Sequence, residues 1–424
     1  MQRPTWIALG TALALALGSL SCGAEYSAPL PPRDSLYFPI GMELHPNGRF
    51  LYVVNSNFDL RDREDQGGTV SVIDTENGEI LSTSSPFIPS FGGHIALNPD
   101  ATRAYITTRF ENEVIALDVA PQGQALYCGE FQADTRPCRI RRLPDTREGA
   151  RIPADPFGVA VNQVTRTIGG ETRSFDVVHL SHIRGEQVSA LSLPDGQVAG
   201  GSLRSAALLA GGNQLVQRPG TLDLYVAPRN TNFVAIFRPY LNELGEVEAI
   251  VRRGTIDLTR RIENVDARGI AFDEDGDRLF VATRRPAALH IIDMQAGPDT
   301  TPQVTTSIPL QARPSEVVVH RGADQRDRVY IPSYQHGLVE VIDVATRALV
   351  DTITVGRSPY SMVVAQQPAQ CRAPGERCLG FVTLFDAGPE GARCDDDASS
   401  CGAVAVIDLD PDSDTFHQVI QTIR

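Results

Sequence analysis

The basic side chains of this sequence are the first candidates for chemistry, because they are all of one kind. All 38 basic residues are arginine, and lysine is absent. A guanidinium stays charged at every physiological pH and presents paired donors that match a carboxylate or a phosphate. A GC-rich genome also favours arginine, so these residues indicate anion binding only where the fold brings several of them together.

The sequence contains none of the common motifs for catalysis. Its eight histidines are scattered, without an HExxH pair. There is neither a Gly-x-Ser-x-Gly nucleophile elbow nor a Gly-rich phosphate loop, and no CxxCH haem-attachment motif occurs. We therefore expect no cofactor and no metal centre, and we assign no catalytic residue.

Acidic residues gather in two runs, 273–277 and 408–414, with oxygen ligands at alternate positions as in calcium loops. Neither run has the downstream Glu of an EF-hand loop, and a tight turn is the alternative interpretation. Five aspartates also end similar apolar segments: Asp74, Asp118, Asp293, Asp343 and Asp408. We interpret these five as turn formers whose carboxylates accept backbone N–H groups, spread around the molecule.

The elements that must position these residues are strands of one repeated phrase. Alternating apolar residues lead into a turn in "GTVSVIDT" (68–75), "NEVIALDV" (112–119), "EQVSALSL" (186–193), "NFVAIFRP" (232–239), "AALHIIDM" (287–294), "GLVEVIDV" (337–344) and "GAVAVIDL" (402–409). A strand pattern such as "FLYVVN" precedes each phrase, and an earlier one such as "GMELHP" precedes most of those. A weaker fourth pattern, such as "ALVDTITV", follows several of the phrases. The fourth repeat is the least regular, and its first strand must come from "GNQLVQRPG".

Seven repeats of four antiparallel strands, without a long helical pattern, predict an all-β fold. The expected architecture is a seven-bladed β-propeller of four-stranded blades that forms one domain over residues 36–424.

Three segments carry a resemblance to a known family: "YVVN" at 52–55, "VSVID" at 70–74 and "TITVGRSP" at 352–359. They resemble the repeats of the YVTN β-propeller family of exported bacterial and archaeal proteins. The resemblance covers most of residues 36–424, weakly over 146–258, and it implies an exported propeller without a single activity. The mature chain does not resemble the pyrroloquinoline-quinone propellers, which use several tryptophans, because the only tryptophan here is Trp6.

Residues 1–22 predict a signal peptide, because Arg3 precedes a short apolar run and small residues. The run ends in "SLSC", which resembles a bacterial lipobox apart from Ser19, where the usual residue is Leu, and which implies lipidation of Cys22. Cleavage by an ordinary signal peptidase is the alternative. Residues 23–35 are Pro-rich and polar, as expected of a flexible tether. We expect a monomer that is lipid-anchored at the cell envelope, at the outer membrane on its periplasmic or surface side.

The six cysteines after Cys22 form three close pairs: Cys128 with Cys138, Cys371 with Cys378, and Cys394 with Cys401. In an oxidising compartment each pair is expected to form a disulfide. Zinc is the competing interpretation, but no pair has the two-residue spacing of a zinc knuckle.

In a propeller, the links between the second and third strands and between successive blades open on the same face, around the mouth of the channel. The ligand-binding residues expected there are Arg109, His182, Arg229, Arg284, Arg313, Tyr334, His336 and Arg357. Pairing of the arginines with nearby acids such as Asp155, Asp266 and Asp386 is the competing expectation.

The net charge of −14 argues against nucleic acid and anionic membrane surfaces as partners. An arginine-rich mouth predicts a non-catalytic binding or scaffold propeller, whose partner is an envelope protein, an anionic small molecule or an acidic polymer. The alternative is a lactonase-like hydrolase, because lactonases use seven-bladed propellers of similar outline. Such an enzyme would need a base and an electrophile at the mouth, and only His182, His336 and the arginines are candidates.

Overall fold

The computed structural model describes residues 28–128, 141–143, 152–194, 202–259, 265–295, 302–365, 378–388 and 402–424. These residues form thirty β-strands and one short 3-10 turn. No helix within these ranges is long and apolar enough to cross a membrane. The expected signal peptide and Cys22 lie outside the described residues.

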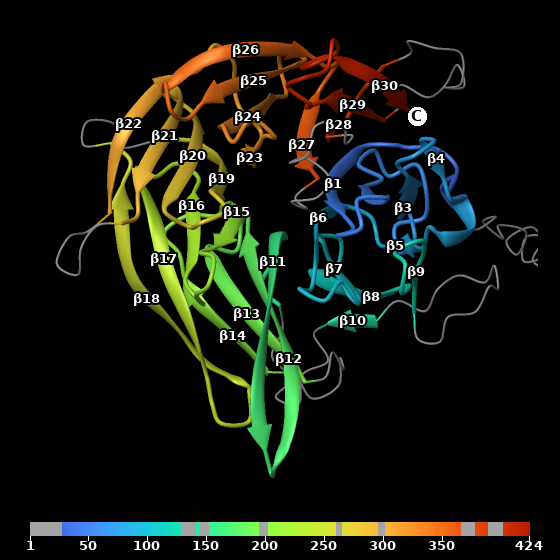
Figure 1. Cartoon of the computed structure of the whole chain (residues 1–424). Helices are drawn as coiled ribbons and strands as arrows, with labels where there is room; N and C mark the ends of the chain where they lie inside the picture. The colour runs from blue at the N-terminus through green and yellow to red at the C-terminus, as the bar shows by residue number, and fades with distance from the viewer. Residues whose placement is uncertain are drawn as a thin grey trace, which may run out of the picture.

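The strands form seven antiparallel sheets arranged as blades around a central axis (Figure 1). In each blade the first strand lies innermost and the later strands follow outwards in chain order. The predicted seven-bladed β-propeller is confirmed, and the uncertain fourth blade begins with the segment expected from its sequence.

The second and third strands of blades 1 and 2 are buried over nearly their whole length, and Phe50–Asn55 and Gly68–Asp74 are buried at every residue. Blade 1 contains β1 (Pro39–Leu44), β2 (Phe50–Asn55), β3 (Gly68–Asp74), β4 (Glu79–Ile80), η1 (Ser82–Ser84) and β5 (Phe87–Ile88). Blade 2 contains β6 (Gly92–Leu97), β7 (Arg103–Thr108), β8 (Glu113–Val119), β9 (Leu126–Tyr127) and β10 (Arg141–Leu143). Blade 3 contains β11 (Pro156–Ile168), β12 (Glu171–His182), β13 (Gln187–Pro194) and β14 (Ser202–Ala207). In blades 1 and 2, two short strands share the outer edge of the third strand and take the place of one fourth strand.

Blades 4 to 7 each have four strands. Blade 4 contains β15 (Gly212–Gln217), β16 (Leu224–Pro228), β17 (Phe233–Leu241) and β18 (Val247–Asp257). Blade 5 contains β19 (Ala267–Phe272), β20 (Arg278–Arg284), β21 (Ala287–Asp293) and β22 (Gln303–Pro309). Blade 6 contains β23 (Val318–Arg321), β24 (Asp327–Ser333), β25 (Leu338–Asp343) and β26 (Ala348–Thr354). Blade 7 contains β27 (Pro359–Val364), β28 (Leu379–Leu384), β29 (Ala403–Asp408) and β30 (Val419–Ile423).

Two hairpins in blades 3 and 4 are longer than the repeat pattern suggests. The β11–β12 hairpin is paired as far as Ile168 and Glu171, and it projects beyond the rest of the ring with the β17–β18 hairpin (Figure 1). The two blades contact each other here: the backbone N–H of Val247 donates to the Ser202 hydroxyl at 2.6 Å. This extension lies in the region where the sequence resembles the repeat family only weakly.

The core consists of apolar layers between adjacent blades. The tyrosine of the repeated "YVVN"-type strand often adds a hydrogen bond across such a layer. The hydroxyl of Tyr52 in blade 1 donates to the Gly123 carbonyl of blade 2 at 2.7 Å. The hydroxyl of Tyr105 in blade 2 donates to Asp176 of blade 3 at 2.7 Å. The tyrosine of the repeat therefore both fills the core and fixes one blade to the next.

The ring closes by packing between blades 7 and 1. Leu51 and Val53 of blade 1 share a buried cluster with Phe381 and Val404 of blade 7. The backbone N–H of Gly402 donates to the carbonyl of Leu36 at 3.0 Å. Within the described part of the chain, each of these two blades is a continuous stretch, and neither lends a strand to the other.

The acidic turns behave as structural elements. The carboxylates of Asp74, Asp293 and Asp408 each accept the backbone N–H two residues later, at 2.9–3.0 Å. In the run 273–277, the Asp273 carboxylate accepts the N–H groups of Asp277 and Arg278 at 2.8 and 3.0 Å. Among the residues that the structure describes, no group of three His, Cys, Asp or Glu side chains is placed to hold a metal ion.

Two of the paired cysteines lie within the described residues. Cys128 and Cys378 are each disulfide-bonded. The expected partners Cys138 and Cys371, and the whole pair of Cys394 and Cys401, lie outside the described residues.

Candidate functional site

Strand pairing defines one ring of equivalent positions at the mouth of the channel. In six blades, the start of the first strand pairs with the last or nearly last residue of the second strand, for example Gly212 with Pro228 and Pro359 with Leu384. The next residue along each second strand opens the link to the third strand, and blade 6 has the same link after Ser333. From blade 1 to blade 7 these residues are Ser56, Arg109, Ile183, Arg229, Arg284, Tyr334 and Phe385. Four of the eight predicted ligand residues therefore share one structural position.

Blades 4 and 5 contribute a group of arginines around one buried carboxylate, that of Asp266. We call the group the cationic arc; it consists of Arg229, Arg268, Arg284 and Arg285. Arg268 lies closest, with Nε 3.0 Å and Nη2 3.1 Å from the two oxygens of Asp266. The side chains of Arg229 and Arg285 approach the same carboxylate at 3.9 and 4.0 Å.

Arg284 completes the cationic arc without a carboxylate of its own. Its Nε donates to the carbonyl of Pro314 at 2.6 Å. Burial, together with the neighbouring charge of Arg268, lowers the pKa of Arg284 to about 10, against the opposing attraction of Asp266. Burial and Arg268 likewise lower the pKa of Arg229. Four guanidinium groups around one carboxylate leave a local excess of positive charge.

One donor of the cationic arc is buried without a close partner among the described residues. Nε of Arg229 forms no hydrogen bond there, and its ion pair with Oδ1 of Asp266 is long, at 3.9 Å. Nε of Arg268 and Oδ1 of Asp266 also lack a hydrogen bond of good geometry, but they lie 3.0 Å apart as an ion pair. Buried polar atoms in native proteins usually have partners, so Nε of Arg229 points to a ligand or to solvent in this place.

The other predicted arginines are not part of the cationic arc. Arg109 donates to Asp155 at 2.6 Å and lies over the rings of Phe91 and Phe157. Arg357 pairs with Asp386 at 3.1 Å. Arg313 is exposed, and its side chain forms no ion pair with the described residues. Pairing with nearby acids therefore applies to Arg109 and Arg357, whereas the cationic arc shares a single acid.

His182 is fully buried and lies under the loop face. Its Nε2 is 2.9 Å from the Ser189 hydroxyl, and burial lowers its pKa to about 4, against smaller opposing effects that include the charge of Asp155. The structure therefore places this predicted ligand residue beneath the surface, as a neutral imidazole near neutral pH.

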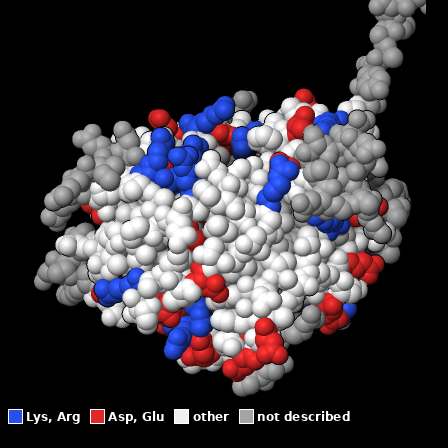
Figure 2. All heavy atoms as spheres, turned by 90° about the horizontal axis from the view of Figure 1, so that it is seen from above, with Lys and Arg blue, Asp and Glu red and all other residues white. Residues whose placement is uncertain are grey.

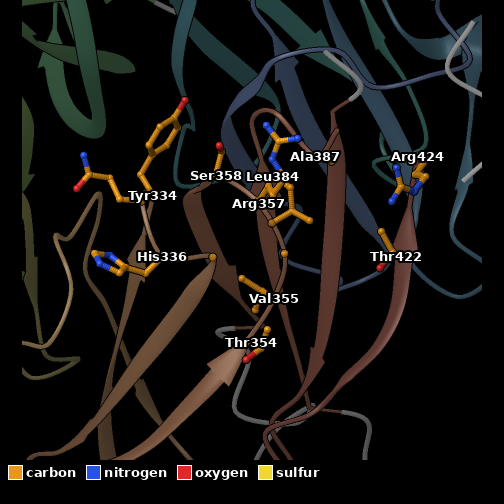
Figure 3. Close-up of a pocket in the computed structure, with 13 residues that line it drawn as sticks. Tyr334, His336, Thr354, Val355, Arg357, Ser358, Leu384, Ala387, Thr422 and Arg424 are labelled. Atoms are coloured by element: carbon orange, nitrogen blue, oxygen red, sulfur yellow. The ribbon is translucent and has the colours of Figure 1, made fainter. Parts of the chain in front are cut away.

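Tyr334, His336 and Arg357 line a pocket of about 510 Å³ between blades 6 and 7 (Figure 3). Leu384 and Val355 supply its apolar wall. The other lining residues are Gln335, Gly337, Thr354, Gly356, Ser358, Ala387, Thr422 and the C-terminal Arg424. The pocket opens beside the ring of equivalent positions, because Tyr334 belongs to both.

Aromatic side chains cover the side of the mouth away from the cationic arc. We call them the aromatic arc: Phe38, Phe58, Phe91, Phe157, Tyr334, Tyr360 and Phe385. The ring of Phe58 lies 5.5–6.1 Å, centroid to centroid, from the rings of Phe38, Phe91 and Phe385. Tyr334 lies 6.2 Å from Phe385 and 6.5 Å from Tyr360. Phe58 is 50% exposed although it contacts three rings.

The candidate site also contains two carboxyl groups. Glu316 lies in the link before blade 6, and Glu43 lies on the innermost strand of blade 1. Gln214 donates to one oxygen of Glu316, and the backbone N–H of Met362 donates to the other at 2.8 Å. Burial raises the pKa of Glu316 to about 7, although these hydrogen bonds oppose the shift. Burial and the charge of Glu316 raise the pKa of Glu43 to about 8. Both groups therefore titrate near neutral pH, above the range of an ordinary glutamate.

Sequence patterns found part of this site. Arg268, Arg285 and Tyr360 fall in the links that the repeat pattern defines, and Arg229 and Arg284 were assigned to ligand binding. Nothing in the sequence indicated that Glu316 or Phe58 would face the mouth. Aligning the residues after every second strand would have found Phe385, because it occupies the position of Arg229 and Tyr334.

Charge is unevenly distributed over the molecule. Seen from above, a broad uncharged band separates the two rims; the largest basic group lies near the upper rim, and the lower rim carries mostly acidic residues with some arginine (Figure 2). The overall negative charge therefore does not prevent local basic patches.

No protein-family model matches the chain, and no curated protein matches it in sequence. Solved structures do match, at low identity. A Kuenenia stuttgartiensis hydrazine synthase chain superposes with a TM-score of 0.54 and 12% identity, covering 88% of this chain and 96% of that one. Pseudomonas aeruginosa periplasmic gluconolactonase, PpgL, gives 0.52 and 14%, covering 76% and 87%.

The dihydro-heme d1 dehydrogenase NirN, in complex with DHE, gives a TM-score of 0.51 and 15% identity, covering 90% of this chain. The alignment spans 64% of the NirN chain. These likenesses show the propeller fold, which carries unrelated activities.

Proposed function

We propose that this protein is a binding propeller that takes a small anionic molecule at the cationic arc. The observation that carries the proposal is the grouping of Arg229, Arg268, Arg284 and Arg285 around the single carboxylate of Asp266. A partly desolvated group of like charges focuses the potential and attracts a counter-charge. Nε of Arg229, which forms no hydrogen bond with the described residues, offers one to a carboxylate or phosphate.

The expected affinity is moderate. A hydrogen bond to a charged group contributes about 1.5–3 kcal/mol. Two or three such contacts correspond to a dissociation constant of roughly micromolar to millimolar, once the cost of association is included.

We place this function at the cell envelope. The signal-like residues 1–22, the lipobox-like ending at Cys22 and the resemblance to the YVTN-repeat family support export and a lipid anchor. The binding face would then be presented to the periplasm or the exterior, with an envelope protein or a small anion as the partner.

Hydrolysis of a lactone is the second candidate function, and Glu316 is the observation that favours it. Its carboxyl group has a pKa of about 7, and it lies close enough to Tyr360 to raise the pKa of that phenol. As a carboxylate, Glu316 would take a proton from water while the water oxygen attacks the lactone carbonyl. An arginine would stabilise the oxyanion. The ring C–O bond would then break while Glu316 returns the proton to the leaving oxygen, which gives a hydroxy acid. The structural likeness to PpgL, a gluconolactonase, is compatible with this second function.

Titration calorimetry on the mature protein tests the first proposal, with citrate and inorganic phosphate as probes. Arg284→Ala and Arg285→Gln should each weaken binding about tenfold or more. Arg253→Gln, in the exposed part of β18, is the matched control and should bind as the parent does. Absence of binding of both probes by the parent protein would overturn the proposal.

A separate assay addresses hydrolysis. Glucono-δ-lactone should be opened faster than in buffer only if the second function holds, and Glu316→Gln should then abolish the difference. If the parent protein gives no acceleration between pH 6 and 9, hydrolysis of this lactone is excluded.

A further inference from the structure

The mouth of the channel is chemically divided, and this division restricts the kind of anion that it fits. Blades 4 and 5 supply the cationic arc. The aromatic arc comes from blades 6, 7, 1, 2 and 3, through Tyr334, Tyr360, Phe58, Phe91 and Phe157 among others. A site that binds a fully hydrated anion does not require the aromatic arc.

We infer that the ligand is an amphipathic acid: a planar, apolar body that packs on the aromatic arc and a carboxylate that binds the cationic arc. This inference rests on the proposed function and specifies its ligand class. Small-molecule sites are typically apolar walls with a few charged groups that fix the orientation of the ligand.

Tyr360 connects the two halves. Its ring lies 6.5 Å from both Phe157 and Tyr334. On the other side, the positive charges of Arg268 and Arg284 act on its phenol, which otherwise has its pKa raised by burial and by Glu316. A ligand that contacts Tyr360 therefore reaches both arcs.

Phe58 is the residue of the aromatic arc with a strongly solvent-exposed side chain. It is half exposed, yet three rings hold it in place at 5.5–6.1 Å. A large apolar side chain fixed in position but left half uncovered is a ready contact for another ring, and stacked or edge-on aromatic pairs contribute beyond the area that they bury.

The arrangement also favours a carboxylate end over a second apolar end. Nε of Arg229 is buried and forms no hydrogen bond within the described residues, so an apolar group placed against it would leave this donor unsatisfied. An acidic group supplies acceptors and offsets the excess charge around Asp266.

The experiment uses the mature full-length protein and three probes: 2-naphthoate, its neutral counterpart 2-naphthamide, and citrate. We expect 2-naphthoate to bind at least about tenfold more tightly than either of the others. Phe58→Ala should weaken 2-naphthoate about tenfold and leave citrate unchanged. Arg285→Gln should weaken both acids. Tyr240→Ala, at the exposed end of β17, is the matched aromatic control and should change nothing.

The outcomes separate this inference from the proposed function. If citrate and 2-naphthoate bind equally and Phe58→Ala has no effect, anion binding stands and the amphipathic ligand is overturned. If 2-naphthamide binds as well as 2-naphthoate while citrate still binds, the carboxylate end of the ligand is overturned and anion binding stands. If neither acid binds, the proposed function fails along with the inference. The far-UV circular dichroism spectrum of Phe58→Ala and its thermal midpoint show whether the variant is folded.

Discussion

At the scale of single residues, the candidate site depends on one acid. Asp266 is 5% exposed and is the only carboxylate within 4.0 Å of the cationic arc among the described residues. It therefore stabilises four like charges that would otherwise repel one another, and it also reduces the attraction that those charges exert on a ligand.

Replacement of Asp266 by Asn should separate these two effects. Loss of the buried charge should lower the free energy of unfolding by about 3–5 kcal/mol, because the guanidinium groups lose their partner. The same change should strengthen citrate binding in whatever fraction remains folded. Urea denaturation and calorimetry measure the two quantities, and Asp293→Asn, at an exposed turn, is the control. A variant of normal stability and normal affinity would show that Asp266 does not hold the arginines.

Glu43 and Glu316 predict an alkaline loss of stability. Their pKa values in the folded protein, about 8 and about 7, lie above the ordinary Glu value of 4.5. The folded state therefore keeps protons that the unfolded state releases, and stability falls as pH rises from about 4.5 to about 8. The buried histidines act in the opposite direction, because the unfolded state binds their protons around pH 6.5, and this effect has nearly vanished by pH 7.5. The window from pH 7.5 to 9 therefore reports mainly on Glu43, the carboxyl group with the higher pKa.

Thermal unfolding at pH 7.5 and pH 9 measures this effect. The midpoint should be lower at pH 9, and Glu43→Gln should remove much of the difference because the buried carboxyl group at position 43 is no longer there to ionise. Equal midpoints for the parent protein at both pH values would contradict the assignment.

At the scale of elements, the repeated tyrosine is the clearest link between sequence and structure. Tyr52 and Tyr105 donate to the next blade at 2.7 Å. Tyr330 reaches His417 of blade 7 at 3.1 Å, and His417 in turn lies 2.7 Å from Asp351. Blades 5 and 7 have Phe280 and Phe381 at this position, so the ring itself fits the space without a hydroxyl.

Tyr-to-Phe substitution at these positions should destabilise the protein in an order set by the acceptor. Tyr105→Phe should cost about 1.5–3 kcal/mol, because its acceptor is a carboxylate, and Tyr52→Phe about 0.5–1.5 kcal/mol, because its acceptor is a carbonyl. Urea denaturation of the two variants provides the comparison. The reverse order would mean that Asn98, which also donates to Asp176, satisfies that carboxylate alone.

The repeat pattern was sufficient to predict the blades but not the length of their hairpins. Alternation of apolar residues identified each strand near the core, including "GNQLVQ" of β15. The distal half of β11, from Asn162 to Ile168, is only partly buried, so its residues carry no strong alternation. The repeat predicts the site residues that occupy equivalent positions in successive blades, such as Arg229 and Arg284. It does not predict Glu316 and Phe58, because their places in the site depend on how different blades meet.

At the scale of the whole molecule, six junctions between blades are continuous in the chain. Blades 7 and 1 are joined through apolar packing and hydrogen bonds among the described residues. Phe381 lies at the centre of that junction with Leu51, Val53 and Val404. Phe280 occupies the equivalent place between blades 5 and 6, in a second buried cluster.

Phe381→Ala should therefore open the ring locally, whereas Phe280→Ala should not. Both variants lose about 3–5 kcal/mol from the cavity that they create. Hydrogen exchange should become faster in blades 1 and 7 together for Phe381→Ala, and only near blades 5 and 6 for Phe280→Ala. Identical exchange patterns in the two variants would show that the closing junction is no weaker than the others.

A ring whose described blades are each one uninterrupted stretch of chain has a consequence for its descent. Duplication or loss of one gene segment would add or remove a complete blade, with all its strand partners, and no neighbouring blade would have to surrender a strand. Lineages of this protein could therefore change their number of blades in single genetic steps, and the closing pair of blades would have to be reshaped each time to match the new curvature.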